Sequence, residues 1–407
     1  MNDFKLKKKV LLKMIILFLA FISCDKADEP DTIEWTTDEE IPILSWHSIK
    51  LAHSSLKGYQ ELKNCGYTHS LATIWSDEDP ITTYNADLLE KALNYAEEVD
   101  IKVIAGCYEL HTDTENTVRR FMEHPALVGW FLADEPSLGE FLNLGYLANK
   151  IKAIDNKNFV YVNLDPINST PAQMGTSSYM RYLNEYLRLV PVDLVSFDLY
   201  PCKLDENGNI YVLDFWYNNL QIIADAAKRE RKDFWAFASG TKFESAQASP
   251  TINTFRLQMY TNLAYGAQGL QYFVYNTDTT SPVYKAVKAM NKEIQNFAKV
   301  FLNAKVVSVT HTGKDIPINT QRFQSAPSVI KTFETGDAGA VVSVLQKGSR
   351  RFFVVVSRDI NNSLPVTIEV DKSVRRVTKN GTLQRVIGKV TGKIPPGDIL
   401  VYTWDED

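Results

Sequence analysis

Short apolar runs alternate with amphipathic stretches between residues 41 and 304. Each run is continuously apolar, which is typical of parallel strands that helices cover on both faces. Eight strands are predicted, at 41–47, 68–75, 101–107, 127–133, 159–163, 194–200, 233–239 and 269–275. Eight strand–helix units predict a (β/α)₈ barrel over residues 41–304. An open doubly wound sheet is the alternative, but no GxGxxG motif follows the first strand.

The stretches between the strands carry the helical period. Leu89, Leu93 and Ala96 share one face, while Glu90 and Glu97 lie elsewhere. Helices are predicted at 89–99, 142–154, 179–189, 213–227, 255–264 and 283–302. These amphipathic segments are expected to cover the outside of the barrel.

Beyond residue 304 the pattern changes to short strands separated by turn residues. Strands are predicted at 306–310, 340–345, 352–357, 366–370 and 399–404. Asn380-Gly381 and Pro395-Pro396-Gly397 supply turns between them. Residues 305–407 are therefore expected to form a small antiparallel β-sandwich. It contains no cluster of exposed aromatic residues, so we favour a structural cap over an independent sugar-binding module.

Composition excludes several classes of protein. Of 407 residues 45% are hydrophobic and 23% are charged, as in an ordinary folded chain. The 44 basic residues face 49 acidic ones, a net charge of −5, so nucleic acid is not an expected partner. Four cysteines are too few for a disulfide scaffold. The six histidines form no HxH or HExxH motif, so neither a metal site nor a cofactor is expected.

The N-terminus has the pattern of a signal peptide. Lys5 and Lys7 to Lys9 precede the apolar run Met14–Ile22, which is about half the ~20 residues needed to span a bilayer. Ser23-Cys24 resembles the lipobox of bacterial lipoproteins, although Phe21 stands where that motif usually has Leu. The resemblance implies cleavage after residue 23 and a membrane anchor through lipid on Cys24. An ordinary secretory signal with an incidental cysteine is the alternative.

Residues 24–40 form an acidic stretch, which we interpret as a tether. It resembles the segment after the lipid-bearing cysteine in surface-exported lipoproteins of Bacteroidetes. This resemblance implies an outer-membrane location, with display on the cell surface as a further hypothesis. Residues 1–23 contain five Lys and one Asp, so their removal would change the net charge from −5 to −9.

Polar and aromatic residues gather where the predicted barrel strands end. The C-terminal ends of the strands form the active face of a (β/α)₈ barrel. Candidates for substrate binding there are Trp46, His47, Trp75, Glu109, His111, Asp134, Asn163, Asp165, Tyr200 and Tyr275. Carboxylates accept hydrogen bonds from sugar hydroxyls and aromatic rings stack on the apolar faces of sugars. The expected partner is therefore a carbohydrate.

The segment 129–136, Gly-Trp-Phe-Leu-Ala-Asp-Glu-Pro, is the most specific motif. It resembles the fourth strand of the (β/α)₈ glycoside hydrolases of the large retaining clan, which ends in Asn-Glu-Pro. Asp134 replaces that Asn, and Glu135 takes the position of the general acid/base. Residues 197–201 and 256–275 carry the same resemblance, the second to glycosidase-like lipoproteins of Bacteroidetes. The alternative role for the acidic pair is to cap the following helix.

The seventh predicted strand departs from that clan. It ends in Ser239, where the resemblance would place a nucleophilic Glu. Glu244 on the same loop, Asp198 and Glu109 are the candidates for a second catalytic carboxylate. Two hypotheses follow: a glycoside hydrolase that uses Glu135 as general acid, and a catalytically inactive glycan-binding protein on a degenerate barrel.

Overall fold

The computed structural model describes residues 32–35, 37–72 and 86–406. The predicted signal peptide, Cys24 and Trp75 lie outside these residues, as do Asp77 and Asp79 after the second strand. Within the described part of the chain, no helix is both long enough and apolar enough to cross a membrane.

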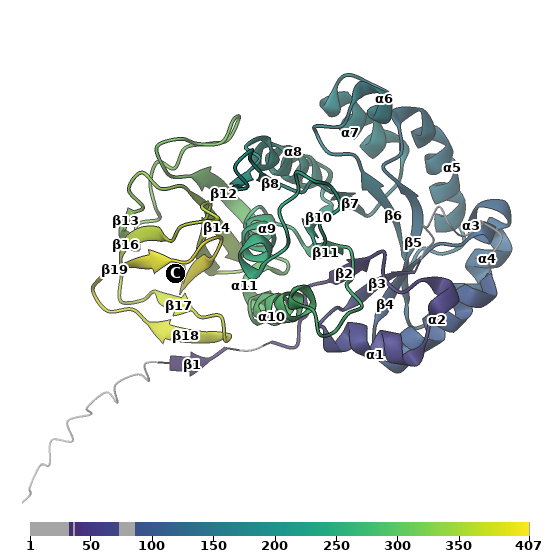
Figure 1. The fold of residues 1–407 in the computed structure, drawn as a ribbon, viewed down its shortest axis with the longest axis horizontal. Coiled ribbons are helices and arrows are strands. Elements are labelled where there is room, and N and C mark those ends of the chain that lie inside the picture. The colour runs from purple at the N-terminus through teal and green to yellow at the C-terminus, as the bar shows by residue number, and fades with distance from the viewer. Residues whose placement is uncertain (1–31, 36, 73–85, 407) are drawn as a thin grey trace, which may run out of the picture. The chain divides into compact units, whose positions relative to one another are not determined.

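A closed barrel of eight parallel strands forms the first part of the fold (Figure 1). Its strands are β2 (Ile43–Trp46), β3 (His69–Ala72), β4 (Lys102–Ala105), β5 (Leu127–Asp134), β6 (Phe159–Leu164), β7 (Leu194–Phe197), β10 (Asp233–Ser239) and β11 (Gly269–Phe273). The barrel closes because β11 pairs with both β10 and β2. All eight strands overlap the predicted runs, so the predicted barrel is confirmed.

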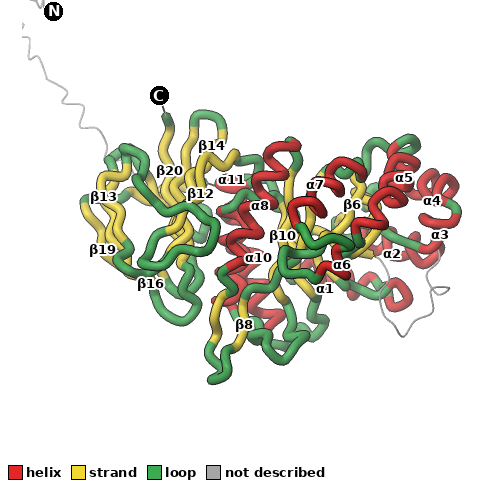
Figure 2. Tube along the Cα trace, turned by 90° about the horizontal axis from the view of Figure 1, so that it is seen from above, coloured by secondary structure: helices red, strands yellow, loops and turns green. Residues whose placement is uncertain are grey.

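Helices surround the barrel strands (Figure 2). They are α1 (Leu56–Asn64), α2 (Ala86–Glu98), α3 (Tyr108–Thr112), α4 (Thr114–Phe121), α5 (Phe141–Lys152), α6 (Pro171–Met174), α7 (Tyr179–Leu189), α8 (Phe215–Glu230), α9 (Ile252–Ala264), α10 (Pro282–Asn296) and α11 (Ala298–Phe301). The short helices α1, α3, α4 and α6 were not predicted. The barrel interior is filled by large side chains, among them Trp46, Phe131, Tyr161 and Trp235. It is therefore a packed core rather than a channel.

Two antiparallel sheets form the C-terminal part of the chain. The larger sheet has the order β1 (Thr32–Glu34), β18 (Thr382–Arg385), β17 (Arg375–Val377), β20 (Ile399–Asp405), β15 (Arg350–Ser357), β14 (Ala340–Lys347) and β12 (Lys305–His311). The smaller sheet has the order β13 (Ile330–Glu334), β16 (Leu364–Val370) and β19 (Lys389–Ile394). Phe353 and Trp404 of one sheet share a core with Ile368 of the other. The predicted β-sandwich is confirmed.

The predicted tether includes one strand of this sandwich. Residues 32–34 form β1, which pairs with β18 at the edge of the larger sheet. Trp35 continues the contact, because its ring lies 6.2 Å from the ring of Phe352. The last part of the acidic stretch is therefore structured rather than a free linker.

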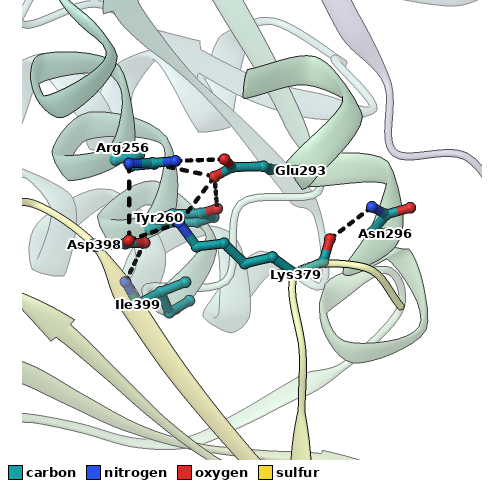
Figure 3. Close-up of polar contacts among 7 residues, drawn as sticks. All are labelled: Arg256, Tyr260, Glu293, Asn296, Lys379, Asp398 and Ile399. Carbon is teal, nitrogen blue, oxygen red and sulfur yellow. Dashed lines mark hydrogen bonds and ion pairs between the residues drawn. The ribbon is translucent and has the colours of Figure 1, made fainter. Parts of the chain in front are cut away.

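A polar cluster joins the barrel helices to the sandwich (Figure 3). Arg256 on α9 donates to both carboxylate oxygens of Glu293 on α10, at 2.5 and 3.1 Å. Lys379, between β17 and β18, lies 3.2 Å from Glu293 and 2.6 Å from Asp398. The Asn296 amide donates to the Lys379 carbonyl at 2.6 Å. Two cations and two anions thus balance each other between α9, α10 and the sandwich.

Candidate active site

A cavity of about 410 Å³ opens at the C-terminal ends of the barrel strands. It is lined by Trp46, His47, Asp134, Glu135, Asn163, Asp198, Tyr200, Phe237, Phe243 and Phe273. Carboxyl and amide groups come from the ends of β5, β6 and β7, and aromatic rings come mainly from β2, β10 and β11. The cavity therefore combines hydrogen-bonding groups with flat apolar surfaces, as carbohydrate recognition requires.

Asn163 links two of the carboxyl groups. Its side-chain amide donates to Asp134 Oδ1 at 3.1 Å and to Asp198 Oδ1 at 2.9 Å. Asn163 is 2% exposed, so these hydrogen bonds form largely away from water. The three side chains come from three successive strands of the barrel, and Asn163 sets the spacing of the two acids.

Glu135 directly follows Asp134, yet both residues line the cavity. Successive residues of a regular strand point to opposite faces. Glu135 departs from that geometry with a φ of 44°, in the left-handed region that non-glycine residues rarely adopt. Its backbone N–H donates to the carbonyl of Asn163 at 2.8 Å, which holds this conformation. Strained backbone of this kind is concentrated at functional sites.

Glu135 and Asp198 line the same cavity, and each influences the ionisation of the other. Glu135 is exposed as a whole residue, and it lines the cavity together with Asp134 and Asp198. Burial raises the pKa of Glu135 to about 9, and the charges of Asp198 and Asp134 add to the effect. Asp198 accepts a hydrogen bond from the Asn163 amide, and the neighbouring Tyr200 also lowers the pKa of Asp198. We therefore place the proton on Glu135 and the negative charge on Asp198.

Two further aspartates contribute to this environment. Burial, followed by the charge of Asp198, raises the pKa of Asp134 to about 7. Asp165, just beyond the end of β6, is 1% exposed, and burial raises the pKa of its carboxyl as well. Both acids oppose the ionisation of Glu135. The site thus favours a protonated Glu135 near neutral pH.

The aromatic wall of the cavity forms a continuous cluster. The Tyr200 ring lies 5.0 Å from Phe243, 5.6 Å from Phe273 and 6.3 Å from Phe237. Trp46 meets Phe237 edge-on at 5.1 Å. The three phenylalanines were not among the predicted site residues. Phe237 and Phe273 lie on apolar strands, where a ring that faces a cavity has the same sequence signal as one in the core.

His47 stands beside this wall, with its ring 5.5 Å from Phe273. Its φ of 43° makes it, like Glu135, a cavity residue in the left-handed region. Burial and the charge of Lys50 lower the pKa of its imidazole. A neutral His47 is able to donate or accept one hydrogen bond at the rim of the cavity.

Other predicted site residues lie outside the cavity lining. Glu109 accepts a hydrogen bond from the backbone of Ala86 at 3.2 Å, at the start of α2. His111 is exposed on α3. Tyr275 is buried, with its ring 5.6 Å from that of Tyr67. The structure does not bring these three residues to the acids.

Glu244, the candidate second carboxylate on the loop after the seventh barrel strand, is paired with a lysine outside the cavity lining. Glu244 forms an ion pair with Lys203 of the hairpin β8 (Cys202–Leu204) and β9 (Ile210–Val212), and it does not line the cavity. Ser239, at the end of β10, donates its hydroxyl to the Thr241 carbonyl at 2.6 Å. Of the three candidates named from sequence, only Asp198 lines the cavity beside Glu135.

Comparisons with known proteins agree with the fold. No family model matches the sequence, and no curated protein matches it. A solved structure described as a glycoside hydrolase aligns with a TM-score of 0.57 at 11% identity, covering 92% of this chain and 93% of its own. A glycoside hydrolase family 5 protein from Bacteroides vulgatus aligns with a TM-score of 0.55 at 11% identity, covering 90% and 89%.

An α-L-arabinofuranosidase from Thermotoga maritima aligns with a TM-score of 0.51 at 12% identity, covering 93% of this chain and 98% of its own. The resemblance to barrel glycoside hydrolases, predicted from the motif at Glu135, is thus confirmed at the level of the fold. At these identities the comparisons do not assign catalytic residues.

Proposed function

We propose that this protein is a glycoside hydrolase that cleaves O-glycosidic bonds of an oligo- or polysaccharide. The observation that carries the proposal is the pair of acids Glu135 and Asp198, which share a cavity with an aromatic wall at the active face of the barrel. A protonated carboxyl beside an ionised one is the pairing that glycoside hydrolysis uses.

Glu135 is the general acid in this proposal. Its raised pKa keeps the proton available for the glycosidic oxygen of the substrate. Asp198 is the second carboxylate, which either attacks the sugar or activates water. Its negative charge is stabilised by the hydrogen bond from Asn163. The reaction needs two carboxyls and water, and no step of it calls for a cofactor.

The separation of the two carboxyl groups decides the stereochemical outcome of the proposed reaction. Retaining enzymes hold their carboxyl groups about 5 Å apart and inverting enzymes about 6.5 to 9.5 Å apart. Glu135 is exposed as a whole residue, so its side chain has room to turn toward a glycosidic oxygen.

A glycan-binding protein without hydrolytic activity is the second candidate function. The end of β10 favours it, because Ser239 is bonded to Thr241 and Glu244 is paired with Lys203. A barrel of this kind would keep Trp46 and Tyr200 for sugar contacts without completing the reaction.

An assay of the purified protein on a panel of glycans separates the two functions, with hydrolysis measured as the release of reducing ends. The wild type should release reducing ends, and Glu135→Gln should reduce kcat by at least about 100-fold. Glu140→Gln is the matched control, because Glu140 is an exposed acid five residues away that caps a 3₁₀ helix, and Gln also suits that position. Binding without turnover by the wild type would favour the glycan-binding protein.

We also propose that the chain is exported and anchored in the outer membrane by lipid on Cys24, with cell-surface display. The support is the sequence pattern of residues 1–23 and the acidic stretch after them. Metabolic labelling with a radioactive fatty acid should mark the wild type and not Cys24→Ser. Protease treatment of intact cells should degrade the protein if it faces outward, and a protected protein would contradict surface display.

A further inference from the structure

A chain of buried polar side chains lies beneath the cavity, inside the barrel. Gln271 on β11 donates to Ser196 Oγ on β7 at 2.8 Å. The hydroxyl of Tyr161 on β6 lies 2.5 Å from Gln271 Oε1 and 2.7 Å from Ser196 Oγ. All three side chains are 0% exposed. Polar groups are costly to bury among aromatic rings unless they are hydrogen-bonded, and these three satisfy one another.

This series of hydrogen-bonded side chains reaches the active site through Ser196. Its hydroxyl donates to Asn163 Oδ1 at 2.9 Å. Gln271 supplies a hydrogen to Ser196 Oγ, so the single proton of Ser196 is available for Asn163. The amide oxygen of Asn163 is thereby occupied on the side away from the cavity. Its NH₂ group donates to Asp134 Oδ1 and Asp198 Oδ1, which accept these hydrogen bonds.

We propose that Ser196 is a positioning residue of the site: its hydroxyl fixes the orientation of the Asn163 amide, and through it the member of the Glu135–Asp198 pair that holds the proton. The catalytic consequence rests on the proposed hydrolase function, whereas the orientation itself does not.

The physical reason is the hydrogen bond that Asp198 receives from Asn163. The Asn163 amide donates to its carboxylate at 2.9 Å, and such a donor stabilises the charged form. Without the Ser196 hydroxyl, Asn163 Oδ1 loses its partner and the amide is free to turn. The negative charge on Asp198 then loses this donor, and the proton moves toward Asp198.

The first measurement does not depend on catalysis. Carboxyl carbons of Asp and Glu are labelled with ¹³C and followed by NMR through a pH titration, with Asp198→Asn and Glu135→Gln to assign the two signals. Ser196→Ala should raise the lower apparent pKa of the pair by about 1, because one hydrogen bond to a charged group is weakened. Ser196→Thr, which keeps the hydroxyl, should restore the titration of the wild type.

Thr68→Val is the matched control. Thr68 precedes β3 at the opposite end of the barrel, is 8% exposed, and accepts a hydrogen bond from the backbone of Ile43 at 2.7 Å. Its loss should lower thermal stability and leave the titration unchanged. If Ser196→Ala does not fold, Ser196→Cys replaces it, because a thiol is a weaker donor of similar size.

The proposal would be overturned if folded Ser196→Ala titrated like the wild type, or if Thr68→Val shifted the lower apparent pKa of the pair by the same amount. The catalytic readout is the acid limb of kcat/KM against pH, which should move upward in Ser196→Ala with little change in KM. If the wild type hydrolyses no glycan while the NMR shift is present, the proposed hydrolase fails and the positioning role of Ser196 stands.

Discussion

Glu135 and Asp198 line the same cavity although they follow strands that are not neighbours in the barrel, since β6 lies between β5 and β7. Asn163 on that intervening strand contacts Asp198 directly and holds the backbone of Glu135 through its carbonyl. One residue thus connects both members of the pair. The arrangement fixes a protonated acid beside a charged one, and the following predictions depend on it.

The activity of the proposed hydrolase should have a bell-shaped dependence on pH. Glu135 must be protonated to act as an acid, so kcat/KM should fall as pH rises through its pKa of about 9. Asp198 must be charged, and burial raises its pKa, so activity should also fall on the acid side at a pH above the usual range of an aspartate. A plot of kcat/KM between pH 4 and 10 tests this, and full activity at low pH would contradict it.

The same pKa of Glu135 predicts a stabilising substitution. Its folded pKa lies above the value of 4.5 that it has when unperturbed, so the folded state holds the proton more tightly. Stability is therefore lost as pH rises from about 4.5 to about 9. Glu135→Gln cannot ionise and should have a higher Tm than the wild type at pH 8, with a smaller difference at pH 5. Glu140→Gln should show no such pH dependence.

Much of the fold could be predicted because its signals are local. Each barrel strand is a continuous apolar run, and β5 alone carries the motif that ends in Asp134 and Glu135. The helix α7 was predicted at its observed bounds, since Tyr182 and Tyr186 follow the helical period. The positions of polar residues at the ends of the strands were then enough to identify the acids of the cavity, Asp134, Glu135 and Asp198, without any knowledge of contacts.

The remainder of the site depends on contacts between distant residues. Ser196 and Gln271 are 75 positions apart in the sequence, and Tyr161 and Gln271 are 110 apart. The apolar runs that contain these residues therefore give no sign of the hydrogen bonds between them beneath the cavity. Glu244 was plausible as a second carboxylate from its place on the loop, but Lys203, 41 positions away, pairs with it. The strand β1 could not be predicted because its partner, β18, lies more than 300 residues later.

The charge of the cavity predicts selectivity among sugars. Three carboxyl groups line it, from Asp134, Glu135 and Asp198, and no lysine or arginine is among its described lining residues. Asp198 carries a negative charge in the proposed active form, so a negatively charged sugar bound there would meet a like charge without a cation. A neutral glycoside should therefore be hydrolysed at least about tenfold faster, by kcat/KM, than the uronic acid glycoside of the same ring and linkage. Equal rates for the two would contradict this reading of the cavity.

The cluster between barrel and sandwich predicts a stability effect at a distance from the cavity. Lys379→Met would remove the cation that contacts Glu293 and Asp398, whose side chains are only 18% and 6% exposed. Leaving partly buried carboxylates without that partner should lower the free energy of unfolding by about 2 kcal/mol, as measured in urea. Lys372→Met, at an exposed lysine of the same sandwich, is the control and should change it by less than about 0.5 kcal/mol. An equal loss in both variants would show that the cluster adds nothing beyond ordinary surface charge.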